Sequence, residues 1–154
     1  MKKKNKIYLI LFIVVIAIFS FKYWNDYRER DLEDLIRLKK SDFIGFSFTN
    51  SGIPILDDKS DGWGTKDIEP VDELLNFLSQ YRVKKQKENF FDTNYKGKRF
   101  GFTIHHNKSN PTMVTVEEKY VHIYNGKYYE VVNDTIDMDW LNAYFEKYQK
   151  EYNR

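Results

Sequence analysis

The hydrophobic pattern of the chain changes abruptly after residue 21. Residues 7–21 read IYLILFIVVIAIFSF, an almost unbroken apolar run, whereas later segments mix apolar and polar positions. About twenty apolar residues in a helix span the hydrocarbon core of a bilayer, and Tyr23 and Trp24 extend the run with interfacial aromatic rings. We therefore predict a basic head and transmembrane anchor over residues 1–24. Its apolar residues include Ile7, Leu9, Leu11, Val14, Ile16, Phe19 and Phe21.

A cleaved secretory signal is the alternative interpretation of this run, because a basic head before an apolar core is also typical of signal peptides. Cleavage needs small residues at two spaced positions, and the chain offers only Ala17-Ile18-Phe19 and Ile18-Phe19-Ser20. This poor site favours an uncleaved anchor. Four lysines precede the run, so the positive-inside rule predicts a cytoplasmic amino terminus and an extracytoplasmic carboxyl-terminal domain.

Residues 25–40 predict a juxtamembrane helical stalk, because they contain no glycine or proline. Leu32, Leu35 and Ile36 recur at helical spacing and form a short apolar stripe. A self-associating coiled coil would need three or more heptads. We therefore expect the stripe to dock on its own domain rather than on a second copy of the chain.

The remaining residues, 41–154, predict a single domain with several strands. Alternation predicts strands over residues 42–49, 99–106, 112–118 and 120–124, and a short polar edge strand over 83–87. Glycine and proline predict a loop over residues 50–65, with Trp63 either folded onto the core or exposed. The inward residues are expected to be Ile44, Phe46, Phe48, Phe100, Phe102, Ile104, Val114 and Val116.

Two amphipathic helices complete the predicted domain. The first begins at Glu69-Pro70 and buries residues at helical spacing, and the second begins after Asp137 as its amino-terminal cap. Their inward residues are Val71, Leu74, Leu75, Leu78 and Tyr81, then Trp140, Leu141, Tyr144, Phe145 and Tyr148. The fold class is α+β, in which an antiparallel sheet of four to six strands packs against these two helices.

Asn125-Gly126 is the strongest local signal in the domain, because this dipeptide favours a two-residue type I′ hairpin. The turn pairs Tyr124 with Lys127 and His122 with Tyr129. Val121 and Ile123 then share one face with Tyr128. The opposite face carries a candidate binding patch of Tyr120, His122, Tyr124 and Tyr129. Tyrosine is common at protein interfaces and its ring also packs on sugars, although it is a good strand residue in any context and the stalk helix could cover this face.

Charge narrows the classes of partner. The chain has 25 Lys and Arg against 23 Asp and Glu, but four of the lysines precede the apolar run. The exported part is therefore slightly acidic, which argues against nucleic acid as a partner. Residues 57–73 are acidic, whereas residues 82–99 are basic and form either an ordinary solvated loop or a basic edge that meets envelope phosphates. The candidate edge consists of Lys84, Lys85, Lys87, Lys96, Lys98 and Arg99.

No motif in the sequence predicts catalysis or a cofactor. Nucleophile elbows, phosphate loops, dinucleotide fingerprints and zinc-protease motifs are all absent. Adjacent His105 and His106 point to opposite faces of a strand, and the chain has no cysteine to complete a metal site, although one of them could meet His122 across strands. Asp57, Asp58 and Asp61 fail the spacing of a helix-loop-helix calcium site and fit at best a looser oxygen site.

The order of these features resembles small membrane-anchored or lipid-anchored exported proteins of Gram-positive bacteria, most of them uncharacterised. The resemblance covers the basic head and apolar run, the segment Thr65-Lys66-Asp67-Ile68-Glu69-Pro70, the strands around Asn125-Gly126 and the closing aromatic helix. It is a resemblance of layout alone. We expect a binding or interaction module at the cell membrane, serving as envelope accessory, regulator or immunity-type protein, whose partner is a protein or an envelope polymer; a cell-envelope hydrolase is the alternative.

Overall fold

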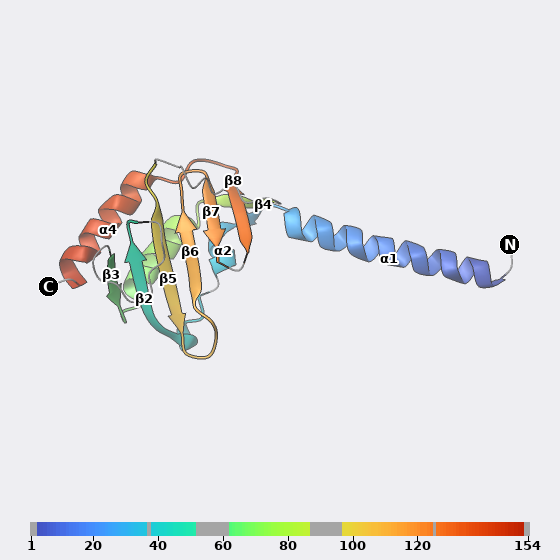
Figure 1. Cartoon of the computed structure of the whole chain (residues 1–154), viewed down its shortest axis with the longest axis horizontal. Helices are drawn as coiled ribbons and strands as arrows, with labels where there is room; N and C mark the ends of the chain where they lie inside the picture. The colour runs from blue at the N-terminus through green and yellow to red at the C-terminus, as the bar shows by residue number, and fades with distance from the viewer. Residues whose placement is uncertain (1–2, 37, 52–61, 87–96, 125, 153–154) are drawn as a thin grey trace.

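The computed structural model describes residues 3–36, 38–51, 62–86, 97–124 and 126–152. They form one long amino-terminal helix and an α+β domain whose antiparallel sheet is covered by helices on one face (Figure 1). The helices are α1 (Lys3–Tyr27), α2 (Leu32–Ile36), the 3-10 helix η1 (Lys40–Asp42), α3 (Glu69–Leu78) and α4 (Met138–Tyr152). The strands are β1 (Arg30–Asp31), β2 (Phe43–Thr49), β3 (Gly62–Thr65), β4 (Arg82–Gln86), β5 (Phe100–His106), β6 (Thr112–Val116), β7 (Tyr120–Ile123) and β8 (Lys127–Val131).

The sheet has the strand order β1-β4-β8-β7-β6-β5-β2-β3. The predicted α+β architecture is therefore confirmed, although the described residues form eight strands where four to six were expected. The two strands that the sequence did not predict, β1 and β3, are short and lie at the two edges of the sheet. Neither shows an alternating apolar pattern in the sequence, so periodicity could not reveal them.

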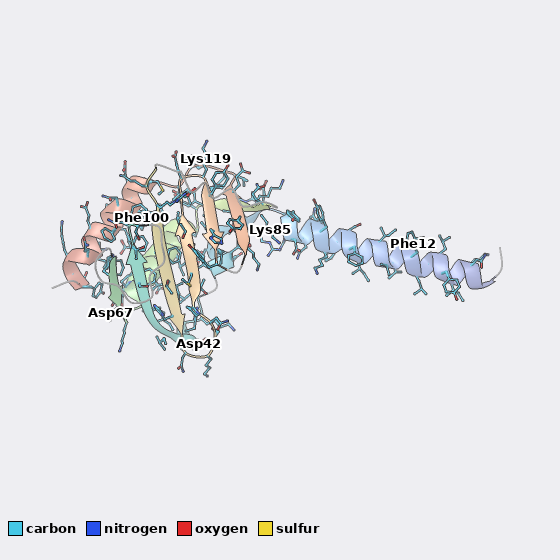
Figure 2. The ribbon with its side chains drawn as sticks, viewed as in Figure 1. Phe12, Asp42, Asp67, Lys85, Phe100 and Lys119 are labelled. Carbon is cyan, nitrogen blue, oxygen red and sulfur yellow. The ribbon has the colours of Figure 1, made fainter. Side chains whose placement is uncertain are left out.

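Helix α1 is apolar, and its carboxyl-terminal end contacts the domain at β4. It includes one stretch, Asn5–Tyr27, that is long and apolar enough to cross a membrane, and the most apolar part of this stretch is not buried in protein. Phe12, near its middle, is 63% exposed, and side chains project from all sides of the helix (Figure 2). A helix that is hydrophobic all round is suited to a lipid environment rather than to water.

The predicted continuous stalk over residues 25–40 is not present as one helix. Helix α1 ends at Tyr27, Arg30–Asp31 form β1, and the chain turns into the short helix α2. Leu32 and Ile36 are fully buried in the domain core, and Leu35 packs against it. The expectation that the apolar stripe docks on its own domain is thus confirmed, because burying these side chains favours folding the segment back over extending it.

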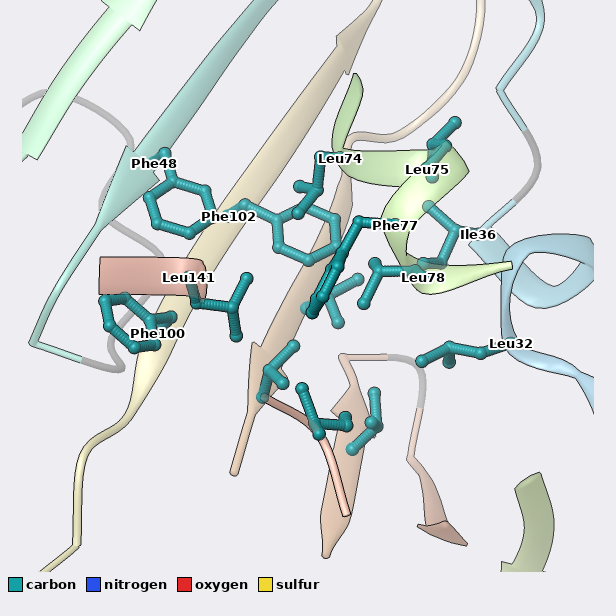
Figure 3. Packing of buried hydrophobic residues seen from close by; sticks show 14 of the residues in the cluster. Leu32, Ile36, Phe48, Leu74, Leu75, Phe77, Leu78, Phe100, Phe102 and Leu141 are labelled. Atoms are coloured by element: carbon teal, nitrogen blue, oxygen red, sulfur yellow. The ribbon is translucent and has the colours of Figure 1, made fainter. Parts of the chain in front are cut away.

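The core lies between the sheet and helices α2, α3 and α4. In Figure 3, Phe102 of the sheet lies close to Leu74 of α3, and Phe100 lies beside Leu141 of α4. The residues predicted to face inward from α3 are all buried, and those from α4 are buried except Trp140, which is half-buried. Asp137 caps α4 as predicted, because its carboxylate accepts hydrogen bonds from the backbone N–H groups of Asp139 and Trp140 at 3.0 and 2.9 Å.

Two predictions for the second strand and the following loop are wrong. Ile44 is 50% exposed, because the pairing of β2 with β5 shifts between Phe43 and Gly45 and this bulge turns Ile44 out of the alternation. The end of the predicted loop forms β3, in which Trp63 pairs with Phe48 and is buried in the core. A Cβ atom on Gly62 would lie 2.6 Å from the carbonyl oxygen of Phe48, so the close approach of β3 to β2 requires glycine there.

Tyrosine hydroxyls attach α4 to α3. The hydroxyl of Tyr144 donates to the carbonyl oxygen of Pro70 at 2.7 Å. The carboxylate of Glu73 accepts hydrogen bonds from the Tyr148 hydroxyl and, at 2.7 Å, from the Lys147 ammonium. Burial raises the pKa of Tyr144 well above its ordinary value, with smaller contributions from Tyr148 and Glu73 nearby. The neutral phenol is thus the form that the folded protein accepts.

We expect alkali to unfold the domain through Tyr144. Because its pKa is raised by folding, its contribution to stability is complete below the ordinary tyrosine pKa of about 10 and is lost as pH rises above that value. The measurement is an alkaline titration that follows phenolate absorbance and circular dichroism together. Tyr144→Phe should unfold at higher pH than the parent chain. If Tyr144 ionised before the circular dichroism changed, its burial in solution would be less than the structure shows.

Candidate functional site

The face of the sheet opposite helices α2, α3 and α4 carries the candidate binding residues. On this face His122 of β7 pairs with Tyr128 of β8, and Tyr120 pairs with Glu130. The rings of His122 and Tyr128 stack with centroids 4.2 Å apart and planes within 8° of parallel. Tyr124, just after β7, packs against the same imidazole at 4.3 Å. We call Tyr124, His122 and Tyr128 the ring stack.

Three of the four residues predicted for the patch lie on this face, and one prediction is wrong. Tyr120 and His122 are half-buried and Tyr124 is 49% exposed, whereas Tyr129 is 5% exposed and belongs to the core. Tyr128 takes the place predicted for Tyr129. The cause is a shift of one residue in the hairpin register, since Ile123 pairs with Lys127 and Val121 with Tyr129. A shift of one exchanges the two faces of a strand.

The turn explains why the register was mistaken. Three residues, 124–126, separate the paired Ile123 and Lys127, where the type I′ prediction required two. Gly126 has φ of +78°, the left-handed conformation that the last residue of a three-residue hairpin loop adopts. Asn-Gly is compatible with both loop lengths. The signal that could have decided between them is the burial of Val131, which the shorter loop would have placed on the outer face.

The chemistry of the ring stack is that of neutral, amphipathic rings. Partial burial lowers the pKa of His122, which favours the uncharged imidazole at neutral pH. Thr115 of β6 pairs with His122 of β7, and its hydroxyl donates a long hydrogen bond of 3.5 Å to the hydroxyl of Tyr124. The accessible part of the stack thus combines an apolar ring with a hydroxyl that both donates and accepts hydrogen bonds.

The predicted basic edge is divided in the structure. Lys98 donates to Asp139 at 2.8 Å, and Arg99 forms an ion pair with the buried carboxylate of Glu117. Lys84 is exposed on β4, and the ammonium of Lys85 lies 5.5 Å from the centre of the Tyr27 ring. Lys87 and Lys96 lie outside the described residues. Two of the six predicted cations therefore have a carboxylate partner in the same chain, a buried one for Arg99 and an exposed one for Lys98.

The histidines and acids do not converge on a metal site in the part of the chain that the structure describes, where no group of three or more His, Asp and Glu side chains is suitably placed. His105 lies opposite Gly45 on the same face as the ring stack, two strands away from His122. Asp57, Asp58 and Asp61, which were considered for a loose oxygen site, lie outside the described residues.

The nearest approach to a hydrolase arrangement involves Asp42, His106 and Thr112. The Nε2 atom of His106 lies 3.2 Å from the Thr112 hydroxyl, but its Nδ1 atom lies 4.0 Å from the Asp42 carboxylate, too far for a hydrogen bond. That carboxylate accepts from the backbone N–H of Lys108 at 2.8 Å and from the hydroxyl of Ser109 at 3.2 Å. The His106 side chain is only 5% exposed. These contacts attach the β5–β6 turn to the start of β2, which is a structural role.

Comparison with known protein families, curated proteins and solved structures finds no match to this chain. Function is therefore inferred from two features of the molecule itself. One is the apolar helix α1, and the other is the ring stack on the face of the sheet opposite helices α2, α3 and α4.

Proposed function

We propose that this protein is a single-pass membrane protein whose extracytoplasmic domain captures a partner protein through the ring stack. Its amino terminus lies in the cytoplasm, helix α1 spans the cell membrane, and the α+β domain is held at the outer surface. The exposed apolar surface of α1 supports the anchor. The observation that carries the binding role is the stack of Tyr124, His122 and Tyr128 on the sheet face opposite helices α2, α3 and α4, where the Tyr124 side chain is 49% exposed.

A protein partner fits the ring stack better than a glycan. Stacking on a sugar needs a flat ring face, whereas the facing surfaces of His122 and Tyr128 already contact each other. Tyr124 offers a half-exposed ring and a hydroxyl, the combination that is enriched in the centre of protein interfaces. A phosphate-rich polymer is less well served, because Arg99 of the predicted basic edge is held in an ion pair with the buried carboxylate of Glu117.

The anchor is tested first. We expect the mature protein to retain residues 1–24, since the end of the apolar run lacks a good cleavage site. The chain has no cysteine, so single-cysteine variants report topology directly. Lys66→Cys should react with a membrane-impermeant maleimide in intact cells, and Asn5→Cys only after lysis. Amino-terminal sequencing that begins near Phe21 would instead show a cleaved signal.

The binding role is tested by the change of Tyr124 and Tyr128 to serine in one chain. A photocrosslinker at position 127, next to the stack, reports capture. We expect the yield of crosslinked partner to fall at least tenfold, because tyrosine anchors commonly contribute more than one kcal/mol each to the binding free energy. The melting temperature should stay close to that of the parent. The matched control is the change of both residues to phenylalanine, which keeps the rings and should preserve most of the capture.

Tyr129→Ser serves as the counterpart of this variant, because it should unfold the domain rather than affect capture alone. If the Tyr124 and Tyr128 variant is folded and captures its partner normally, the binding surface lies elsewhere. If the parent chain loses its capture when wall glycan is removed, the partner is a polymer and the assignment of a protein partner is wrong.

A further inference from the structure

The edge of the sheet formed by β1 and β4 follows directly on the apolar helix. Only two residues, Arg28 and Glu29, separate the end of α1 at Tyr27 from β1. Strand β1 pairs with β4, Arg30 opposite Val83 and Asp31 opposite Arg82. In Figure 1 this edge is the part of the domain nearest to α1, whereas β3 and the carboxyl end of α4 lie farthest away. The connection is too short to let the domain move far from the end of the helix.

Side-chain contacts hold the end of α1 against this edge. The guanidinium of Arg30 donates to the carbonyl oxygen of Asn25 in the last turns of α1. Arg82 of β4 forms an ion pair of 3.2 Å with Glu29. The ammonium of Lys85 lies 5.5 Å from the centre of the Tyr27 ring, within reach of a cation–π interaction. The helix end and the strand edge are therefore one continuous surface.

The height of this surface follows from the aromatic residues of α1. Tyr23 and Trp24 end the apolar stretch and are suited to the membrane interface. Tyr27 lies three residues beyond Trp24, which is about 4.5 Å along a helix. A head-group layer is roughly 5 to 8 Å thick on each side of the hydrocarbon core. With α1 across the bilayer, Lys85 beside Tyr27 lies at the level of the lipid phosphates.

We propose that the β1–β4 edge binds the anionic phospholipid head groups of the leaflet from which α1 emerges, so that the domain lies on the membrane surface by this edge. The inference rests on the proposed anchoring. It names a second surface, distinct from the ring stack, and a lipid phosphate as its ligand. The exposed cation of Lys84 and the half-buried cation of Lys85 provide the attraction on β4.

The local charge agrees with this assignment. Residues 22–31 and 82–86 together carry six basic and three acidic side chains, and Glu29 is already paired with Arg82. On the neighbouring strand, Glu130 lies opposite Lys84 and accepts a hydrogen bond of 2.6 Å from Gln86, and with this carboxylate the edge carries six basic and four acidic side chains. Acidic residues gather instead at the start of α3, and Figure 2 shows Asp67, just before α3, at the end of the domain remote from α1. A domain with separated charges is oriented by an anionic surface with its basic end toward it.

The test uses full-length protein in nanodiscs and a single fluorescent label. Val132→Cys places the label beside β4, since the Val132 N–H donates to the Arg82 carbonyl at 2.9 Å, and Lys66→Cys places it beyond β3. Lipids with a quencher on the head group report proximity to the surface. We expect quenching at position 132 to exceed that at position 66 several-fold in phosphatidylcholine containing roughly a third phosphatidylglycerol.

The charge dependence identifies the ligand. Changing Lys84 and Lys85 to glutamine should lower the ratio of docked to undocked domain about 25-fold. The matched control, Lys108 and Lys150 changed to glutamine, removes the same charge from exposed sites outside this edge and should leave quenching unchanged. Salt at about 1 M, where the Debye length is roughly 3 Å, should act like the Lys84 and Lys85 change.

Each outcome decides the proposal. Equal quenching at positions 132 and 66, or quenching at 132 that does not depend on phosphatidylglycerol, overturns it. Flotation with liposomes tests the anchor separately, because a chain that fails to float with lipid contradicts the anchoring itself. A chain that floats but shows no preferential quenching contradicts only the contact of the β1–β4 edge with the head groups.

Discussion

Replacing Arg99 with methionine is expected to lower the free energy of unfolding by about 3 to 5 kcal/mol, because the change removes a cation from beside a buried carboxylate. The side chain of Glu117 is only 3% exposed and that of Arg99 is 22% exposed, and Arg99 Nε donates to Glu117 Oε1. A carboxylate that loses its ion-pair partner in a site of low polarity must either stay charged at high cost or take up a proton.

A double change separates the loss of the ion pair from the loss of packing. Changing Arg99 to methionine and Glu117 to glutamine in the same chain should recover much of the lost stability, because no buried charge then remains. Lys98→Met is the matched control at the next residue. It breaks an ion pair with Asp139 whose two side chains are 55% and 91% exposed, so denaturant unfolding should hardly change. Equal losses for Arg99→Met and Lys98→Met would contradict the burial of Glu117.

Phe48→Ala is expected to destabilise the domain by about 3 to 5 kcal/mol, the usual cost of removing a large buried aromatic side chain. Phe48 is fully buried at the centre of the aromatic core. Its ring lies 5.1 Å from that of Tyr144 on α4 and 5.8 Å from those of Trp63 on β3 and Phe100 on β5. Removing it leaves a cavity between the sheet and α4 that these rings cannot easily fill.

The control for Phe48→Ala lies on the same strand. Ile44→Ala removes a side chain that the bulge at Phe43 and Gly45 leaves 50% exposed, so it should change the melting temperature very little. Thermal unfolding followed by circular dichroism compares the two variants directly. If Ile44→Ala costs as much as Phe48→Ala, then β2 keeps unbroken alternation in solution and the bulge is absent.

The elements that the sequence determined by itself are those whose pattern repeats locally. Val71, Leu74 and Leu78 must share a face once residues 69–78 are helical, so their burial follows from spacing alone. Phe100, Phe102 and Ile104 alternate without interruption and are buried for the same reason. The apolar helix needs no partner at all to be recognised, because its composition suffices. These elements could therefore be predicted without knowing which surface each of them packs against.

The tertiary structure decided whatever depends on residues that are distant in the chain. Gly62–Thr65 has no strand pattern and becomes a strand because β2 offers its free edge. The hairpin register, and with it the exchange of Tyr129 for Tyr128 in the ring stack, depends on which tyrosine the core accepts, since Asn-Gly fits two loop lengths. The sequence assigned Arg99 to a basic edge. In the structure Arg99 forms an ion pair, because the fold places Glu117 beside it. Periodicity carries information over a few residues, whereas strand pairing and ion pairing join segments whose proximity only the folded chain creates.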